Sequence, residues 1–259
     1  MTPTPTPITL EAADGCRLQG REVVALDAPA AVVLAHGLCA SMDEPEFHAT
    51  VGFVADCGYT TVSYDSRGHG TSGGESTLGD IERLDVAAAV DHARELHERV
   101  IVVGASMGAI AVLRHAATDP DLAGVVTVSC PDRWQLPRTV RAVLAASLTQ
   151  TRPGRWVTCR YLGARISPEW TAPAPPVELA ARVAAPLAVV HGTHDRFIPP
   201  GAARHIAEAA PGPVTTHLVQ GMGHAYSRAA FLTLRNAIAW CLDVGALVAS
   251  PAPLGPADR

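Results

Sequence analysis

Several features that mark other classes of protein are missing from this sequence of 259 residues. Residues 1–7 have neither a basic start nor an apolar stretch, so we expect no secretory signal peptide. No uninterrupted apolar run reaches about 18 residues, so we expect no membrane span. No two cysteines have the C-x-x-C spacing of zinc or redox sites, and we expect reduced, mostly buried thiols in a cytoplasmic protein. The six cysteines are Cys16, Cys39, Cys57, Cys130, Cys159 and Cys241.

Lysine is also absent, so all 20 basic residues are arginines, and the formal net charge is -5. The sequence pI of about 6.1 gives no indication that nucleic acid or an anionic membrane surface is the main partner. With 48% hydrophobic and 17% charged residues, the chain is able to bury a large core as one α/β domain. We expect a small-molecule substrate and neither a cofactor nor a metal ion.

One stretch organises the rest of the chain. Five residues from Val100 onward are small or β-branched and apolar without alternation, which is typical of a strand buried on both faces of a parallel sheet. Gly104-Ala105-Ser106-Met107-Gly108 follows, a G-x-S-x-G match, and then a helix-compatible run to about Ala117. The two glycines leave room for a tight strand-to-helix turn that would hold the serine oxygen at the carboxyl edge of the sheet. Ser106 is therefore the candidate nucleophile, and a structural turn serine is the alternative.

Predicted strands and helices alternate along most of the chain. Residues 8–12 and 16–26 flank the turn dipeptide Asp14-Gly15, which predicts a hairpin of two antiparallel edge strands. Further strands are predicted at residues 31–35, 59–64, 100–104, 122–129, 186–192 and 214–219. Further helices are predicted at residues 46–57, 78–97, 201–210 and 226–244. This order predicts an α/β fold with a mostly parallel central sheet of about eight strands and helices on both faces.

The alternation stops at residues 131–182, which contain no apolar strand. Seven prolines interrupt this segment, and residues 138–148 and 156–165 are its only candidates for short helices. We therefore predict one discontinuous core domain, residues 1–130 and 183–249, with an inserted cap at 131–182. Residues 250–259 form a Pro/Ala-rich tail that has no core to join.

A serine nucleophile needs a base to take its proton, and the base needs a carboxylate to fix its tautomer. Asp195 follows the strand at 186–192, and His224 follows the strand at 214–219. Loops at the carboxyl ends of parallel strands meet at one edge of the sheet, where such folds place ligands. Ser106, Asp195 and His224 are therefore the predicted catalytic residues.

Other roles remain open for these side chains. Asp195 precedes two prolines and would also suit a helix N-cap, and His224 would also suit an ordinary loop histidine. His191, His194 and Asp195 together contain metal-ligand chemistry, but His191 is predicted at a strand end, away from the loop that carries His194. We therefore expect no metal site there.

Four pieces in this order resemble the α/β-hydrolase superfamily, specifically its short-capped serine esterase, lipase and thioesterase-like branches. They are the His36-Gly37 loop, the loop at residues 65–70, the serine turn, and the loops of Asp195 and His224, together spanning residues 8–245. The order Ser, Asp, His is the one that α/β hydrolases have. Ala105 stands where the family more often has histidine or tyrosine, which removes a bulky group beside the site.

The resemblance implies further roles. The oxyanion hole would use the backbone N–H groups of Leu38 and Met107, and Asp65 and Arg67 would brace the loops around them. One such donor is worth roughly 10²–10³ in rate. Cys39 follows Leu38, and we expect it to be a small buried side chain that lines the pocket.

The resemblance also implies a serine hydrolase that cleaves a carboxylic ester or a thioester through an acyl-enzyme. The alternatives are a thioesterase or acyltransferase for carrier-bound acyl chains and a non-catalytic binding protein with this fold. An arginine-rich cap favours an anionic substrate or an acidic carrier protein, although a solvated face is the usual explanation. Its arginines are Arg133, Arg138, Arg141, Arg152, Arg155, Arg160 and Arg165. Its aromatic residues, which we expect to pack the cap on the body, are Trp134, Trp156, Tyr161 and Trp170.

Overall fold

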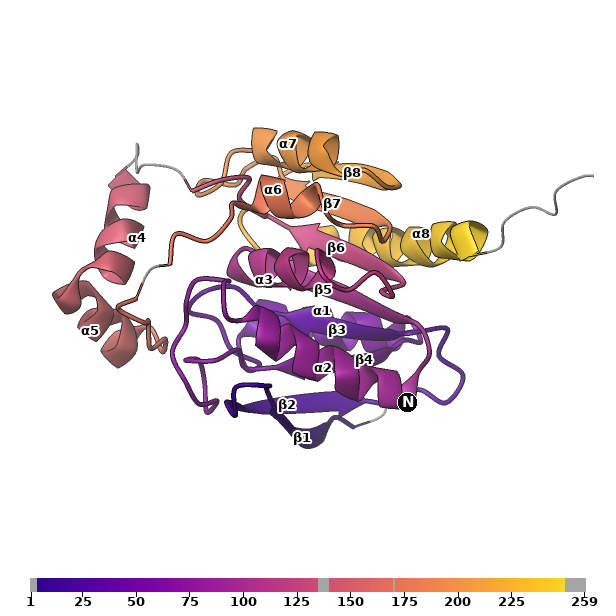
Figure 1. The fold of residues 1–259 in the computed structure, drawn as a ribbon, viewed down its shortest axis with the longest axis horizontal. Coiled ribbons are helices and arrows are strands. Elements are labelled where there is room, and N and C mark those ends of the chain that lie inside the picture. The colour runs from indigo at the N-terminus through magenta and orange to yellow at the C-terminus, as the bar shows by residue number, and fades with distance from the viewer. Residues whose placement is uncertain (1–3, 135–139, 170, 250–259) are drawn as a thin grey trace, which may run out of the picture.

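The computed structural model describes residues 4–134, 140–169 and 171–249. Within them, eight strands form one sheet in the order β1-β2-β4-β3-β5-β6-β7-β8 (Figure 1). Strands β3 to β8 run parallel to one another, and β1 and β2 form the antiparallel part. The strands are β1 (Thr6–Glu11), β2 (Arg17–Val23), β3 (Ala31–Ala35), β4 (Thr60–Tyr64), β5 (Val100–Ala105), β6 (Gly124–Val128), β7 (Leu187–Gly192) and β8 (Val214–Val219). The predicted α/β fold with a mostly parallel eight-stranded sheet is confirmed.

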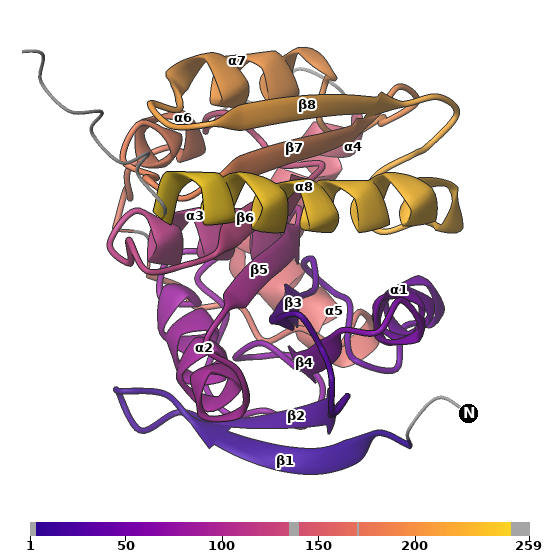
Figure 2. The ribbon, with the colours of Figure 1, turned by 90° about the vertical axis from the view of Figure 1, so that its right-hand side faces the viewer.

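Helices cover both faces of the sheet, as predicted (Figure 2). Successive strand residues point to opposite faces. Ala31 and Val33 of β3 belong to the core on one face, which is completed by helices α2 (Arg83–Leu96), α3 (Met107–Ala116), α6 (Pro176–Ala180) and α7 (Gly201–Ala209). Val32 and Leu34 belong to the core on the other face, which is completed by α1 (Pro45–Asp56) and α8 (Phe231–Ala249). Burial on both faces explains why these strands read as continuous apolar runs.

The N-terminal hairpin forms, but β2 is not an edge strand. It pairs antiparallel with β1 on one side and with β4 on the other, so β1 alone lies at this edge. The turn is where it was predicted, with Gly15 at a φ of 80°. The alternation of apolar and polar residues in β2 indicates that one face of the strand is buried. It carries no information on whether a neighbouring strand is hydrogen-bonded along one edge of β2 or along both.

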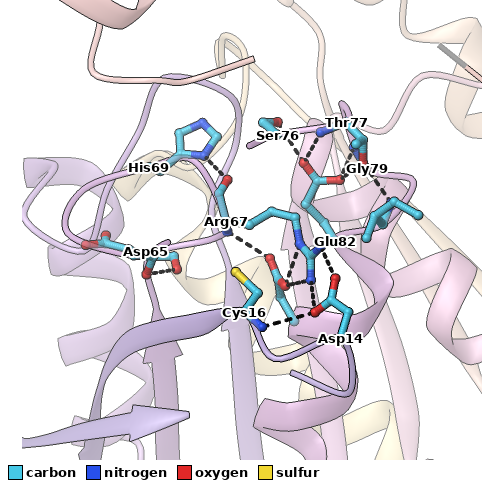
Figure 3. A network of polar contacts seen from close by, with 12 residues as sticks. Asp14, Cys16, Asp65, Arg67, His69, Ser76, Thr77, Gly79 and Glu82 are labelled. Carbon is cyan, nitrogen blue, oxygen red and sulfur yellow. Dashed lines mark hydrogen bonds and ion pairs between the residues drawn. The ribbon is translucent and has the colours of Figure 1, made fainter. Parts of the chain in front are cut away.

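Helix α2 begins at Arg83, five residues later than predicted. Glu82 is buried, and its carboxylate accepts the N–H groups of Thr77 (2.8 Å) and Gly79 (2.9 Å), as Figure 3 shows. Leu78 and Gly79 have positive φ values of 62° and 98°. A side chain at Gly79 would meet Ile110 Cβ at 2.7 Å, so this stretch packs on α3 instead of extending α2.

Helix α8 also begins later than predicted, because Tyr226 has another role. Its buried hydroxyl donates to the carbonyl of Ala35 at 3.0 Å and lies 3.3 Å from the carbonyl oxygen of Val103, near the ends of β3 and β5. A 3-10 turn, η1 (Arg228–Ala230), then leads into α8. The side chain of Ser227 caps this turn by accepting the Ala229 N–H at 3.3 Å.

Helices α4 (Val140–Gln150) and α5 (Arg152–Tyr161) lie together at one end of the molecule, to the left in Figure 1. The chain returns from them through two isolated β-bridges, His69 with Ala164 and Ser76 with Ile166. Further along, α6 packs into the core cluster between α3 and α7. The division into a core and an inserted cap at 131–182 stays a prediction. Arg138, Trp170 and the tail at 250–259 lie outside the described residues, as does the side chain of Arg141.

The cap aromatics differ from one another in their packing. Trp134 packs against the core and donates from Nε1 to the Pro173 carbonyl at 2.7 Å, as expected of a residue that joins cap and body. Trp156 and Tyr161 are 62% and 67% exposed, so the same expectation was wrong for them. They contact each other edge to face, with ring centroids 6.0 Å apart.

All six cysteines are free, but the expectation that most are buried was wrong. Only Cys130 and Cys241 are buried, while Cys39 and Cys159 are exposed. In the described parts of the chain, none of the helices combines the length and the apolar character needed to cross a membrane.

Candidate active site

Ser106 lies on a strained turn between β5 and α3, with φ 52° and ψ −112°. A non-glycine residue at positive φ is uncommon and costs free energy, which neighbouring contacts must offset. The flanking glycines allow the necessary close approach. A side chain at Gly104 would meet the Gly108 carbonyl oxygen at 2.3 Å, and one at Gly108 would meet the Ala35 and His36 carbonyl oxygens at 2.5 Å. The G-x-S-x-G spacing is therefore a packing requirement of this turn.

The structure brings Ser106, His224 and Asp195 together, although they are far apart in the sequence. The Ser106 hydroxyl lies 2.9 Å from Nε2 of His224. The Nδ1 atom of His224 lies 2.8 Å from Oδ2 of Asp195. The carboxylate fixes the proton on Nδ1, which leaves Nε2 free to accept from the serine.

Asp195 is held by its own loop and is not a helix N-cap. Its Oδ1 accepts the backbone N–H groups of Phe197 (2.8 Å) and Ile198 (2.9 Å), while α7 begins only at Gly201. Burial of this fully enclosed side chain opposes its ionisation, but the hydrogen bonds from His224 and the two backbone groups outweigh burial and lower its pKa. Asp195 therefore faces His224 as a carboxylate.

His191 contacts this loop and helps to hold Asp195 in place, a role that the sequence did not reveal. Its buried Nε2 lies 3.1 Å from the Ile198 carbonyl and 3.5 Å from Oδ2 of Asp195. Burial lowers its pKa, so the ring is neutral near pH 7. The sequence signal for this role of His191 was its position at the end of β7. Among the described residues, no three His, Cys, Asp or Glu side chains group in a way that would hold a metal ion.

Leu38 and Met107 both lie next to the nucleophile: Leu38 lines the same cavity as Ser106, and Met107 directly follows Ser106 in the chain. Met107 opens α3, so its N–H is one of the donors that a helix leaves without an intrahelical partner. Leu38 lies between two residues held by histidines. His36 Nδ1 donates to the Gly37 carbonyl at 2.7 Å, and His69 Nε2 accepts the Cys39 N–H at 3.2 Å.

Asp65 and Arg67 brace the loops around this site, in the positions that the resemblance implied. Asp65 accepts the Met42 N–H at 2.7 Å and so holds the chain that follows Leu38. The buried Arg67 guanidinium lies 2.7 Å from Asp14 and 2.7 Å from Asp85, and it ties the hairpin turn to α2 (Figure 3).

Residues 27–174 match the protein family described as serine aminopeptidase, S33. The chain belongs to this family. Its fold is that of the α/β hydrolases. The uncharacterized protein YqkD of Bacillus subtilis is 24% identical over 240 residues, which cover 86% of this chain and 73% of that protein.

Solved structures of other α/β hydrolases share the fold at low sequence identity. The Pyrococcus furiosus esterase Pf2001 is 19% identical with a TM-score of 0.68, over 95% of this chain and 92% of that one. The α/β hydrolase GrgF from a Penicillium species is 17% identical with a TM-score of 0.72, over 93% and 98%. Est1E from Butyrivibrio proteoclasticus, solved with ferulic acid, is 17% identical with a TM-score of 0.65, over 94% and 100%.

In this S33-family chain, a cavity of about 260 Å³ opens beside Ser106 and His224. Its walls come from the loop after β3, the start of α1 and the residues after His224, with Phe47 and Tyr226 as its aromatic lining. Cys39 is exposed and is not among the lining residues, so the expectation of a buried side chain facing the pocket was wrong. The exposed ring of Phe197 lies with its centroid 5.1 Å from that of His224 and partly covers the imidazole.

Proposed function

We propose that this protein is a serine hydrolase that cleaves a carboxylic ester or a thioester through an acyl-enzyme. One observation carries the proposal: the continuous hydrogen-bonded chain from Ser106 Oγ through His224 to Asp195, with spacings of 2.9 and 2.8 Å. These distances are those of a nucleophile within reach of its base and of a base within reach of its orienting carboxylate. A turn serine and a loop histidine without catalytic roles would have no need of this alignment.

In the proposed reaction, Ser106 Oγ attacks the carbonyl carbon while His224 Nε2 takes the hydroxyl proton. Asp195 holds the imidazole in the required tautomer and stabilises its charged form. The N–H groups of Leu38 and Met107 donate to the oxyanion that forms. His224 then gives its proton to the leaving alcohol or thiol. Water, deprotonated by His224 in turn, attacks the acyl-enzyme and releases the acid and the free Ser106 hydroxyl.

The choice of an ester bond has support from the named functions of structural neighbours. Pf2001, which has the same fold, is named an esterase, and Est1E binds ferulic acid, a carboxylic acid of the kind that ester hydrolysis releases. We also propose a cytoplasmic location, because all six cysteines are free thiols and the cytoplasm keeps thiols reduced.

A second candidate is a thioesterase or acyltransferase for acyl chains on an acidic carrier protein. It is favoured by the arginines of α5, Arg152, Arg155 and Arg160, which lie in a segment from 133 to 168 without a single acidic residue. Replacement of these arginines would slow turnover of carrier-bound substrate and leave free esters unaffected. The same loss with both substrates would remove this candidate.

The test of the main proposal uses p-nitrophenyl esters from acetate to dodecanoate and labelling by a fluorophosphonate. We expect turnover with an optimum at one acyl length, one label per chain, and loss of both with Ser106→Ala while the unfolding temperature is retained. Undiminished turnover or labelling in Ser106→Ala would sink the proposal. A chain that takes neither substrate nor label would instead be the non-catalytic binding protein, the second of the two alternatives.

A further inference from the structure

A larger cavity, of about 420 Å³, lies between α4–α5 and the body of the molecule. Trp134, Leu78 and Ile166 give it apolar walls, while the end of α4 contributes Thr149 and Gln150. Its volume is within the range of small-molecule sites, which combine apolar walls with a few placed polar groups. None of the residues described above as catalytic candidates lines it.

Ser76 and Met107 separate this cavity from the serine turn. Ser76 lines the cavity, and its buried hydroxyl lies 3.3 Å from Sδ of the buried Met107, which directly follows Ser106. Leu78 also lines the cavity, and its neighbour Gly79 packs on Ile110 in the second turn of α3. The cavity thus begins one layer of side chains away from the nucleophile, and a substrate with its carbonyl at Ser106 would reach it across Met107.

Two arginines and one acid line the cavity. Arg155 donates from Nη1 to the Gln150 carbonyl at 2.9 Å, and in the described part of the chain its guanidinium has no carboxylate partner. A guanidinium has five N–H donors, so this contact leaves donors for a ligand. Arg133 also lines the cavity but is tied to Asp132 at 2.8 Å. The exposed Glu169 is the one acid among the lining residues.

We propose that this cavity binds an anionic group, a carboxylate or a phosphate, that the substrate carries at a distance from the bond attacked by Ser106. The inference rests on the proposed function and adds the substrate class to it. Arg155 would bind the anion directly, because a guanidinium matches the geometry of two carboxylate or phosphate oxygens. Trp134, Leu78 and Ile166 would contact the apolar chain that joins the anion to the carbonyl.

The experiment compares matched substrates that differ only in the anionic group. Butyryl-4′-phosphopantetheine against butyryl-pantetheine tests a phosphate on the leaving group. The p-nitrophenyl ester of adipic acid against the same ester with a terminal carboxamide tests a carboxylate on the acyl group. We expect kcat/KM to favour the anionic member of one pair by about tenfold or more, since a charge-assisted hydrogen bond contributes on that order.

Variants separate the cavity from the general charge of the helices. Arg155→Gln is expected to bring the preference close to one, with a smaller loss for Arg133→Gln because Asp132 already holds that side chain. Arg152→Gln is the matched control, since Arg152 lies on the same helix, is exposed and does not line the cavity. Its preference should equal that of the wild type.

Equal kcat/KM within both pairs, or a preference that Arg155→Gln leaves intact, would overturn the inference. Turnover of p-nitrophenyl butyrate by the same preparation would show that the proposed function still stands. Titration calorimetry of both pairs on Ser106→Ala measures the cavity without turnover. Equal affinities there would reject the anion site even if no substrate were hydrolysed, and tighter binding of one anionic member that Arg155→Gln abolishes would support it.

Discussion

The imidazoles of His36 and His69 meet edge to face, with ring centroids 5.0 Å apart, and together they fix both ends of residues 37–39. Each ring uses both nitrogens. His36 accepts the Ser66 N–H at 3.0 Å with Nε2, and His69 Nδ1 donates to the Arg67 carbonyl at 3.0 Å. Neither ring has a nitrogen left for a further proton. The Leu38 N–H is therefore placed by two neutral histidines that do not line the cavity beside Ser106.

His69→Ala is expected to lower kcat of p-nitrophenyl ester hydrolysis by about 10–10² with little change in KM, because a misplaced oxyanion donor weakens only transition-state binding. His69→Asn keeps an acceptor for the Cys39 N–H and should recover part of kcat. A purely structural role would show as a lower unfolding temperature with wild-type kcat at low temperature. That pattern would contradict the positioning role.

Asp195→Asn is expected to lower kcat by about 10⁴-fold with KM nearly unchanged, because an amide N–H facing Nδ1 favours the tautomer in which Nε2 cannot accept a proton. Steady-state kinetics on p-nitrophenyl butyrate measures this. Asp43→Asn is the control, since Asp43 is an exposed ion-pair partner of Arg21 at the surface. A loss below tenfold in Asp195→Asn would remove Asp195 from the proposed triad.

Stability is expected to fall with acid because of the buried histidines. Burial, together with repulsion between two protonated rings if His69 were also charged, lowers the pKa of His36 to about 3, and burial also lowers the pKa of His69. The unfolded chain binds these protons near pH 6.5 and the folded chain does not, so stability is full above that pH and is lost as pH falls toward 3. Each histidine contributes a slope of about 1.4 kcal/mol per pH unit. Urea unfolding of the wild type and His36→Asn between pH 4 and 7 should give a shallower slope for the variant, and equal slopes would contradict this.

Two glycine substitutions should act in opposite directions. Gly108→Ala is expected to cost several kcal/mol, on the order of the largest single-residue effects, because its Cβ would lie 2.5 Å from two backbone oxygens. Gly52→Ala, in the middle of α1 with no atom within 4 Å of the added Cβ, is expected to stabilise by about 0.5–1 kcal/mol. Urea unfolding measures both. Similar free energies of unfolding for the two variants would show that the contact at Gly108 is relaxed.

The parts of the site that follow from local rules were predictable from the sequence. A G-x-S-x-G after an apolar strand requires the turn at Ser106, and chain order placed Asp195 and His224 at the ends of β7 and β8. His69 was missed as a site residue because its partner, the Cys39 N–H, is 30 residues away and carries no sequence signal. The late start of α2 was missed for a similar reason, since the helical spacing from Leu78 is real but Glu82 uses its carboxylate on the preceding backbone.

The segment that follows α5, residues 164–166, connects helices α4 and α5 to the loop that contains Gly68 and His69. Arg165 exchanges backbone hydrogen bonds with Gly68 and Ser76, and Gly68 directly precedes the histidine that positions Leu38. The same few residues therefore anchor the helices that shape the larger cavity and the loop that orients the oxyanion donor. Substitutions in α4 and α5 are therefore expected to change the larger cavity alone. Substitutions at residues 164–166 would also disturb the loop that orients the oxyanion donor.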